Sequence, residues 1–373
     1  MTESRTDAND LPYWLALVRM PGVGPVTARA LLEQHGTPRQ LFAAGAAALQ
    51  GVGRLEGSAK AYLQKPDWPA VERDLNWLAQ AHTHAVTVQD AAYPPLLKQI
   101  ADPPLVLFVQ GDPGLLAAKQ LAVVGSRNPT AAGEQTAAEF ARHLAGVGLT
   151  ITSGLAVGID AAAHRGALMG DGSTIAVAGT GLDRVYPARH RDLAHEIAAR
   201  GALVSEFPPG TPPRPEHFPR RNRLISGLSL GTLVVEAAVQ SGSLITARLA
   251  AEQGREVFAI PGSIHNPLAR GCHALLRQGA KLVETAQDIL EELGALAAWG
   301  DIPAIPAAMA TLREDIPQEF QHLLHHIGFE PTAVDSLVER SGLTAEQVSS
   351  MLVVLELHGQ IASAPGGLYT RIH

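Results

Sequence analysis

One stretch of the sequence decides the fold: Leu121-Ala122-Val123-Val124-Gly125-Ser126-Arg127. Four consecutive apolar residues are typical of a strand that is buried on both of its faces. A small polar turn follows at once, and residues 131–145 have the apolar spacing of an amphipathic helix. A strand that leads through a short turn into a helix is the repeating unit of an α/β sheet. The stretch therefore predicts a parallel sheet with a ligand site beyond the carboxyl ends of its strands.

The same alternation of strand and helix continues along the chain. Helical patterns separate further apolar runs, as expected for a sheet that helices cover on both faces. The sequence therefore predicts the α/β fold class, with an extended Rossmann-like core of parallel strands over residues 86–298. The further apolar runs lie at residues 149–152, 174–178, 203–205, 232–236, 256–260 and 281–283.

A helical domain is expected before the core, over residues 1–85. Residues 11–36 predict two helices joined by a tight turn at Met20-Pro21-Gly22-Val23-Gly24-Pro25, a pattern similar to a helix-hairpin-helix or SAM-like unit. The backbone N–H groups of such a turn accept a phosphate, but its glycines serve equally well to form a tight corner. Both interpretations stay open, because residues 1–85 carry no net charge and phosphate contacts need a positive potential.

A linker rich in helix breakers, residues 299–310, separates the core from a C-terminal block at residues 311–373. Three helical segments and a hairpin around Pro365-Gly366-Gly367 predict a winged-helix domain. The expected recognition helix, residues 344–358, has two glutamates and no lysine or arginine. A helix that enters a DNA groove needs cations for the neighbouring phosphates. We therefore predict that this domain binds protein or packs on a neighbouring domain instead of binding DNA.

The overall composition is that of a globular protein. Hydrophobic residues make up 46% and charged residues 17% of the 373 residues, which allows a sizeable core. We find no signal-peptide pattern and no apolar run long enough to cross a membrane, so we expect a cytoplasmic protein with no membrane partner. The single cysteine, Cys272, excludes an intramolecular disulfide and a cysteine zinc cluster, and we expect no metal. Because the net charge is −7, a nucleic-acid site has to be a local cluster of cations.

Small, polar and basic residues gather where the predicted strands end. Glycine frees backbone N–H groups, serine supplies a hydroxyl, and arginine binds phosphate with a planar pair of donors. A helix that begins at the same place adds the positive end of its dipole. The densest group is FPRRNRLISG at residues 218–227, in which Phe218 offers a face for base stacking. The residues predicted to bind phosphate are Gly125, Ser126, Arg127, Ser153, Gly154, Arg165, Arg221, Asn222, Arg223 and Ser243.

Other residues near these strand ends favour structural roles. Asp160 is typical of a helix cap, and His164 is typical of a core or capping histidine. The turn Gly179-Thr180-Gly181 lacks the third glycine of a dinucleotide-binding loop, because Arg184 stands at that position. No Walker A, HExxH, CxxC or GxSxG motif is present. We therefore expect neither a cofactor nor catalysis.

Eight motifs follow one another in a fixed order between residues 125 and 280. Their order and sequence resemble the DNA-processing protein A (DprA/Smf) family, and the helical and winged-helix-like flanks fit that family too. The motifs are GSR (125–127), SGLAVGIDAAAH (153–164), GTGLDRVYP (179–187), SEFPPG (205–210), FPRRNRLISGLS (218–229), SGSLITA (241–247), GREVFAIPG (254–262) and GCHALLRQGA (271–280).

The resemblance implies a protein that binds single-stranded DNA without sequence preference in a basic pocket at the strand ends. It also implies a homodimer formed through the Rossmann-like core. The family loads the RecA recombinase onto DNA coated by single-strand-binding protein during natural transformation. Arg127 matches the arginine of GSR, Arg221-Asn222-Arg223 match the RNR run, and Arg165 stands where many members have lysine. His190 and His273 stand where asparagine is frequent, and both keep the capacity to form hydrogen bonds.

Two other functions compete with this interpretation. Residues 225–232 with Glu236 loosely resemble the signature of nucleotide phosphoribohydrolases of the lysine-decarboxylase-like group, enzymes in which the glutamate is catalytic. The leading Pro-Gly-Gly of that signature is absent, since Ser226-Gly227 stands in its place. The second alternative is a structural adaptor whose anion pocket no longer has a function.

Overall fold

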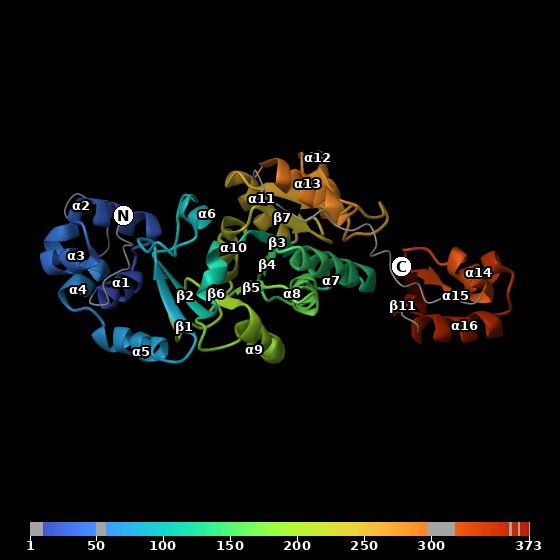
Figure 1. Ribbon diagram of the computed structural model, residues 1–373, viewed down its shortest axis with the longest axis horizontal. Helices are drawn as coiled ribbons and strands as arrows, with labels where there is room; N and C mark the ends of the chain where they lie inside the picture. The colour runs from blue at the N-terminus through green and yellow to red at the C-terminus, as the bar shows by residue number, and fades with distance from the viewer. Residues whose placement is uncertain (1–9, 50–56, 297–317, 358–359, 365, 373) are drawn as a thin grey trace.

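The structure is a computed structural model that describes residues 10–49, 57–296, 318–357, 360–364 and 366–372. Its central feature within these residues is a nine-stranded sheet (Figure 1). The strand order is β1 (Thr83–Thr87), β2 (Val106–Gly111), β6 (Ala202–Ser205), β5 (Thr174–Val177), β4 (Thr150–Ser153), β3 (Gln120–Val124), β7 (Gly231–Val234), β8 (Glu256–Ala259) and β9 (Lys281–Leu282).

The strands from β6 to β9 run parallel to one another. The chain moves outward from β3 through β4 and β5 to β6, and then returns to the other side of β3 as β7. The strand order therefore reverses between β3 and β7. Loops that follow two strands at such a reversal diverge to opposite sides and leave a crevice for a ligand. The predicted α/β fold class with a Rossmann-like core is confirmed.

An antiparallel edge extends the sheet beyond the predicted parallel strands. β2 pairs antiparallel with both β1 and β6. The direction of a strand depends on its connections, so a short apolar run alone does not reveal this edge. β1 covers residues 83–87, and the expected boundary between helical domain and core, at residue 85, therefore falls inside a strand.

Helices cover both faces of the sheet. Leu121 and Val123 of β3 pack in one apolar cluster, and Ala122 and Val124 pack in another on the opposite face, since successive side chains of a strand alternate. α7, α8 and α13 contribute to the first cluster, and α6, α10, α11 and α12 contribute to the second. The helices of the core are α6 (Pro95–Lys98), η2 (Pro113–Ala117), α7 (Ala131–Gly146), α8 (Ile159–Met169), η3 (Ala188–His190), α9 (Arg191–Arg200), α10 (His217–Leu228), α11 (Ser243–Glu252), α12 (Arg270–Arg277) and α13 (Ala286–Leu296).

The N-terminal helices pack directly on the edge of the sheet. Gly22, with a φ of +71°, forms the turn between the first two helices. Buried Trp14 and Leu17 share one apolar cluster with Phe108 of β2, and the rings of Trp77 and Phe108 meet edge to face at 6.2 Å between centroids. The helical part is therefore continuous with the core. It contains α1 (Leu11–Val18), α2 (Pro25–His35), α3 (Pro38–Ala44), η1 (Gly45–Leu49), α4 (Gly57–Gln64) and α5 (Trp68–Leu78).

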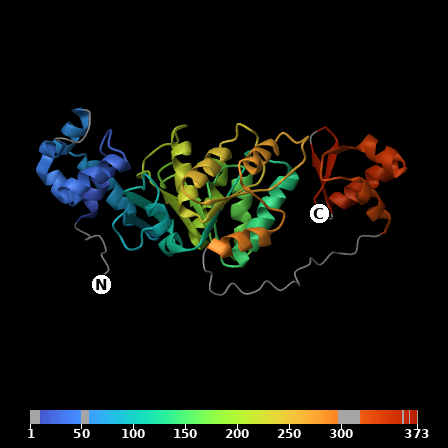
Figure 2. The ribbon, with the colours of Figure 1, turned by 90° about the horizontal axis from the view of Figure 1, so that it is seen from above.

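The C-terminal part forms its own apolar cluster around Leu337, Val348 and Leu352. Its strands lie in the order β10-β12-β11, and β11 and β12 lie near α7. Figure 2 shows the helical part, the sheet and this part following one another along the molecule. Its elements are α14 (Gln318–His326), β10 (Thr332–Ala333), α15 (Val334–Ser341), α16 (Ala345–Leu357), β11 (Ile361–Ala364) and β12 (Leu368–Arg371). Among the helices of the described ranges, none has the length and apolar character to span a bilayer.

Candidate nucleic-acid interface

A cavity of about 430 Å³ lies at the crevice between β3 and β7, and we call it the core cavity. Its walls come from the loops after β3 and β7, from Ala156 and Asp160 after β4, and from one side of α10. Four segments that are distant in the sequence thus meet at one edge of the sheet. Six of the ten residues predicted to bind phosphate line the cavity: Gly125, Ser126, Arg127, Arg221, Asn222 and Ser243.

Arg127 brings unoccupied hydrogen-bond donors to the core cavity. Its side chain is exposed and forms no hydrogen bond or ion pair within the described ranges. The turn before it is held tightly, because the N–H of Ile159 donates to the carbonyl of Ser126 at 3.1 Å. An added Cβ at Gly125 would lie 2.6 Å from the Ile159 side chain, so only glycine allows α8 to pack this closely. The fold therefore fixes the backbone position from which the Arg127 side chain extends.

Arg221 brings a buried charge to the same cavity. It is 4% exposed, and its Nη1 donates to the carbonyl of Val177 at 2.9 Å. The guanidinium packs against Gly154, where any Cβ would overlap it. Burial lowers the pKa of Arg221 to about 10, and the nearby Asp160 carboxylate partly offsets that effect. Arg221 therefore supplies a fixed positive charge, whereas Arg127 supplies free donors.

The start of α11 lines the cavity on the side of β7. The hydroxyl oxygens of Ser241 and Ser243 lie 2.7 Å apart, and the N–H of Ser243 donates to the Ser241 hydroxyl at 3.3 Å. The first N–H groups of a helix attract anions. Ser241 and Thr246 were not in the predicted set, although both line the cavity. The signal was present in SGSLITA, where the hydroxyl residues are close enough together to share one helix start.

The other four predicted residues do not line the core cavity, which corrects the expectation that they join the site. Ser153 is buried and its hydroxyl donates to the carbonyl of Val123 at 2.6 Å. The N–H of Gly154 donates to the Asp160 carboxylate at 3.1 Å. Arg165 lies on the exposed side of α8. Arg223 is buried in ion pairs, because residues two apart on a helix point to nearly opposite sides.

The ring of Phe218 lines the core cavity and the ring of Tyr186 packs beside it, and we call these two residues the aromatic ledge. Phe218 lines the cavity, and its ring centroid lies 5.4 Å from that of Tyr186. Tyr186 is 50% exposed. An exposed ring beside an anion site offers a surface on which a nucleobase stacks.

The histidines near the site support the backbone. His190 Nδ1 lies 2.9 Å from the carbonyl of Leu155, and His273 Nε2 lies 2.9 Å from the carbonyl of Gly262. His164 is fully buried. Because the Thr174 hydroxyl donates to the carbonyl of Ile151, His164 Nδ1 has to donate to that hydroxyl, at 2.7 Å. The predicted role of His164 as a core histidine agrees with these contacts.

The carboxylate of Glu236 is engaged at the start of α7. Its two carboxylate oxygens accept hydrogen bonds from the N–H of Thr130 at 2.8 Å and from the Thr130 hydroxyl at 2.6 Å. Thr130 in turn caps α7 through the N–H of Gly133. The carboxylate therefore fixes the start of α7, which is a structural role.

Known proteins with similar sequences decide the family. A family model described as DNA recombination-mediator protein A matches residues 84–294, and one described as the DprA winged helix domain matches residues 306–367. The chain belongs to the DprA/Smf family. Protein Smf of Escherichia coli K12 is 46% identical to it over 330 residues, which cover 88% of this chain and 87% of that protein.

Two solved DprA structures are similar to the chain. The DprA of Streptococcus pneumoniae matches with a TM-score of 0.68 and 38% identity, covering 75% of this chain and 97% of that one. The DprA of Helicobacter pylori matches with a TM-score of 0.53 and 31% identity, covering 59% of this chain and 99% of that one. The latter structure concerns the single-stranded DNA binding mode of that protein. These matches confirm the DprA/Smf resemblance and the winged-helix domain.

Proposed function

We propose that this chain binds single-stranded DNA in the core cavity without sequence preference. The observation that carries the proposal is the exposed guanidinium of Arg127, which has no partner within the described ranges and faces a cavity that also holds Arg221. A guanidinium binds phosphate through two parallel donors. The start of α11 adds donors of its own at the same cavity.

The aromatic ledge supports binding of a single strand over a duplex. Stacking of a base on an aromatic ring tolerates every base, because each base has a π-face. Contacts with phosphates are likewise independent of sequence. The single-stranded DNA binding of the Helicobacter pylori relative supports the same conclusion.

The family membership supports a role in which the chain brings other proteins to the bound DNA. We propose that the chain loads RecA onto the bound strand in natural transformation, as a cytoplasmic homodimer joined through the Rossmann-like core. Single-strand-binding protein on the same strand is a further partner in this proposal. The role is binding without catalysis, and the engagement of Glu236 by Thr130 argues against the phosphoribohydrolase alternative.

Fluorescence anisotropy with labelled oligo-dT and with its duplex tests the proposal. The wild type is expected to bind the single strand more tightly than the duplex, and Arg127→Ala is expected to weaken that binding. Arg277→Ala is the matched control, because Arg277 is an exposed arginine that lies outside the core cavity. Equal loss in both variants would place the site elsewhere. Release of free base from a nucleoside monophosphate by the wild type would support the enzyme instead.

A further inference from the structure

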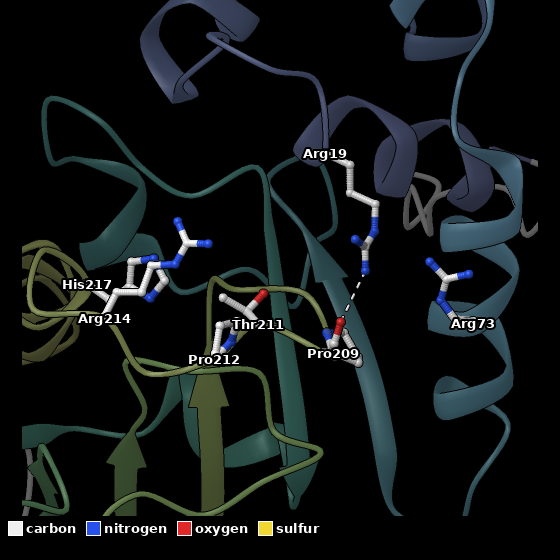
Figure 3. Close-up of a pocket in the computed structure, with 8 residues that line it drawn as sticks. Arg19, Arg73, Pro209, Thr211, Pro212, Arg214 and His217 are labelled. Carbon is white, nitrogen blue, oxygen red and sulfur yellow. Dashed lines mark hydrogen bonds between the residues drawn. The ribbon is translucent and has the colours of Figure 1, made fainter.

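A second cavity, of about 530 Å³, lies where the N-terminal helices meet the core, and we call it the junction cavity. Figure 3 shows Arg19 and Arg73 on the helical side of it and Arg214 and His217 on the core side. The loop at residues 209–212 completes the wall. Three arginines thus surround a space that none of the predicted phosphate ligands reaches.

Two of these arginines have free charges. Arg19 is not free, because its guanidinium pairs with buried Asp74 at 2.6 Å and 2.5 Å and donates to the carbonyl of Pro209 at 3.2 Å. Arg73 and Arg214 are exposed, and neither forms a hydrogen bond or ion pair with a residue that the structure describes. The junction cavity therefore holds two guanidinium groups that form no hydrogen bond or ion pair with the described residues.

Two acidic groups near this cavity, Asp74 and Asp183, already have partners. Asp74 is fully buried and is neutralised by Arg19. Asp183 accepts a hydrogen bond from the N–H of Gly210 at 2.7 Å and pairs with Arg184 at 2.8 Å. An anion that enters the cavity therefore meets Arg73 and Arg214 without a competing free carboxylate from these two residues.

The junction cavity adjoins the core cavity. His217 lines the former and Phe218 lines the latter, and these two residues are neighbours in the chain at the start of α10. His217 is held in place, since its ring stacks on Phe207 at 4.3 Å between centroids. One polymer that crosses the start of α10 can therefore occupy both cavities.

The helical side of the junction is fixed relative to the core. The hydrogen bond from Arg19 to Pro209 crosses the junction (Figure 3), and the apolar cluster that contains Trp14 and Phe108 lies beneath it. Arg73, on α5, is therefore held opposite Arg214 by folded structure on both sides.

We propose that the junction cavity is a second phosphate site, at which Arg214 and Arg73 bind backbone phosphates of the DNA strand that leaves the core cavity. This inference rests on the proposed single-strand binding. It gives the N-terminal helices a direct part in DNA binding, through Arg73 rather than through the glycine turn. It also makes the footprint longer than the core cavity alone would allow.

The test compares oligo-dT of about six nucleotides, near the lower end of common single-strand site sizes, with oligo-dT of about twenty, which exceeds them. The double variant Arg73→Ala/Arg214→Ala is expected to bind the short strand like the wild type and the long strand about tenfold more weakly. Its salt dependence on the long strand, the slope of log affinity against log salt, should become shallower by about 1.4, the value for two phosphates on a single strand. Arg73→Lys/Arg214→Lys keeps the charges and should retain most of the affinity.

Arg142→Ala/Arg277→Ala is the matched control, because both residues are exposed arginines that line neither of the two cavities. Equal affinity of the junction variant and this control for the long strand would overturn the second site. Such a result would leave the proposed function standing as long as Arg127→Ala loses binding to both lengths. Failure of the wild type to bind either length would instead remove the proposed function, and the inference with it.

A small phosphate-containing molecule is the alternative ligand that two arginines in the junction cavity would bind. Isothermal titration with inorganic pyrophosphate, in the absence of DNA, separates the two ligands. Tight binding of pyrophosphate that the junction variant loses, together with unchanged binding of the long strand, would assign the cavity to a small anion and overturn the strand assignment. Weak binding of pyrophosphate, with long-strand affinity lost in the variant, supports the assignment to DNA.

Discussion

The guanidinium of Arg223 lies 2.6 Å from the carboxylate of Glu206, and both side chains are almost completely buried. Asp102 lies 2.9 Å from the same guanidinium, and Arg220 reaches the same glutamate at 2.9 Å. One arginine of the RNR motif therefore ties α10 to the segment after β6. Its neighbour Arg221, two residues earlier, faces the core cavity instead.

Arg223→Ala is expected to destabilise the fold by about 3 kcal/mol, because it leaves the Glu206 charge buried without this partner. Urea unfolding followed by circular dichroism measures the change, and exposed Arg165→Ala serves as the control. Unchanged stability combined with loss of DNA binding would move Arg223 back into the DNA site.

Arg127→Ala should remove one phosphate contact and leave the fold intact, since the Arg127 side chain forms no hydrogen bond or ion pair with the described residues. The plot of log affinity against log salt should lose about 0.7 from its slope, the value for one phosphate on a single strand. Anisotropy titrations at four salt concentrations measure this slope. If the variant has the same slope of log affinity against log salt as the wild type, Arg127 does not contact a phosphate.

Tyr186→Ala should weaken single-strand binding by about 1 to 2 kcal/mol through loss of base stacking. Tyr186→Phe should bind like the wild type, because it keeps the ring and loses only the hydroxyl. Competition anisotropy with oligo-dT and oligo-dA measures both variants. If the phenylalanine variant is as weak as the alanine variant, the hydroxyl and not the ring is the contact.

His164 should make stability fall in mild acid. Burial lowers the pKa of His164 from the ordinary 6.5 to about 3, so the unfolded chain takes up a proton below pH 6.5 and the folded chain does not. The contribution of neutral His164 to the free energy of unfolding is complete above pH 6.5. Below pH 6.5 it falls by about 1.4 kcal/mol per pH unit, so about 2 kcal/mol is lost at pH 5. Urea unfolding between pH 5 and 7.5 should show that the difference between wild type and His164→Gln shrinks by this amount. The exposed histidine variant His195→Gln should show no such change, and an equal pH profile for all three proteins would contradict the assignment.

Deletion of residues 311–373 should leave single-strand affinity within about threefold of the full chain, because α16 (Ala345–Leu357) has no lysine or arginine with which to contact phosphates. Anisotropy on oligo-dT compares the two proteins. A loss of about tenfold or more would show that the C-terminal domain contacts DNA.

The sheet was predictable because its strands are short continuous apolar runs. The apolar run from Leu121 to Val124 indicates a strand that is buried on both faces of the sheet. The structure places its alternate residues in two apolar clusters on opposite faces. The antiparallel edge was not predictable in the same way, since the apolar pattern of β2 carries no direction.

The site was most directly predictable where a strand end determines the position of a residue. Gly125, Ser126 and Arg127 follow β3 directly and reach the core cavity. Arg221 and Arg223 are both arginines of the same motif. They differ only in the direction in which each points from α10. The junction cavity gave no local signal, because Arg73 and Arg214 are far apart in the sequence and meet through tertiary packing.

The apolar cluster shared by Trp14 and Phe108 determines how the chain can be divided. Removal of the N-terminal helices would uncover the outer face of β2, so the two parts should melt in a single cooperative transition. The cluster around Leu337 and Val348 is separate, and it marks an independent unit of unfolding. A shortened protein for crystallisation should therefore keep the helices with the sheet, and only the C-terminal unit is a candidate for expression by itself.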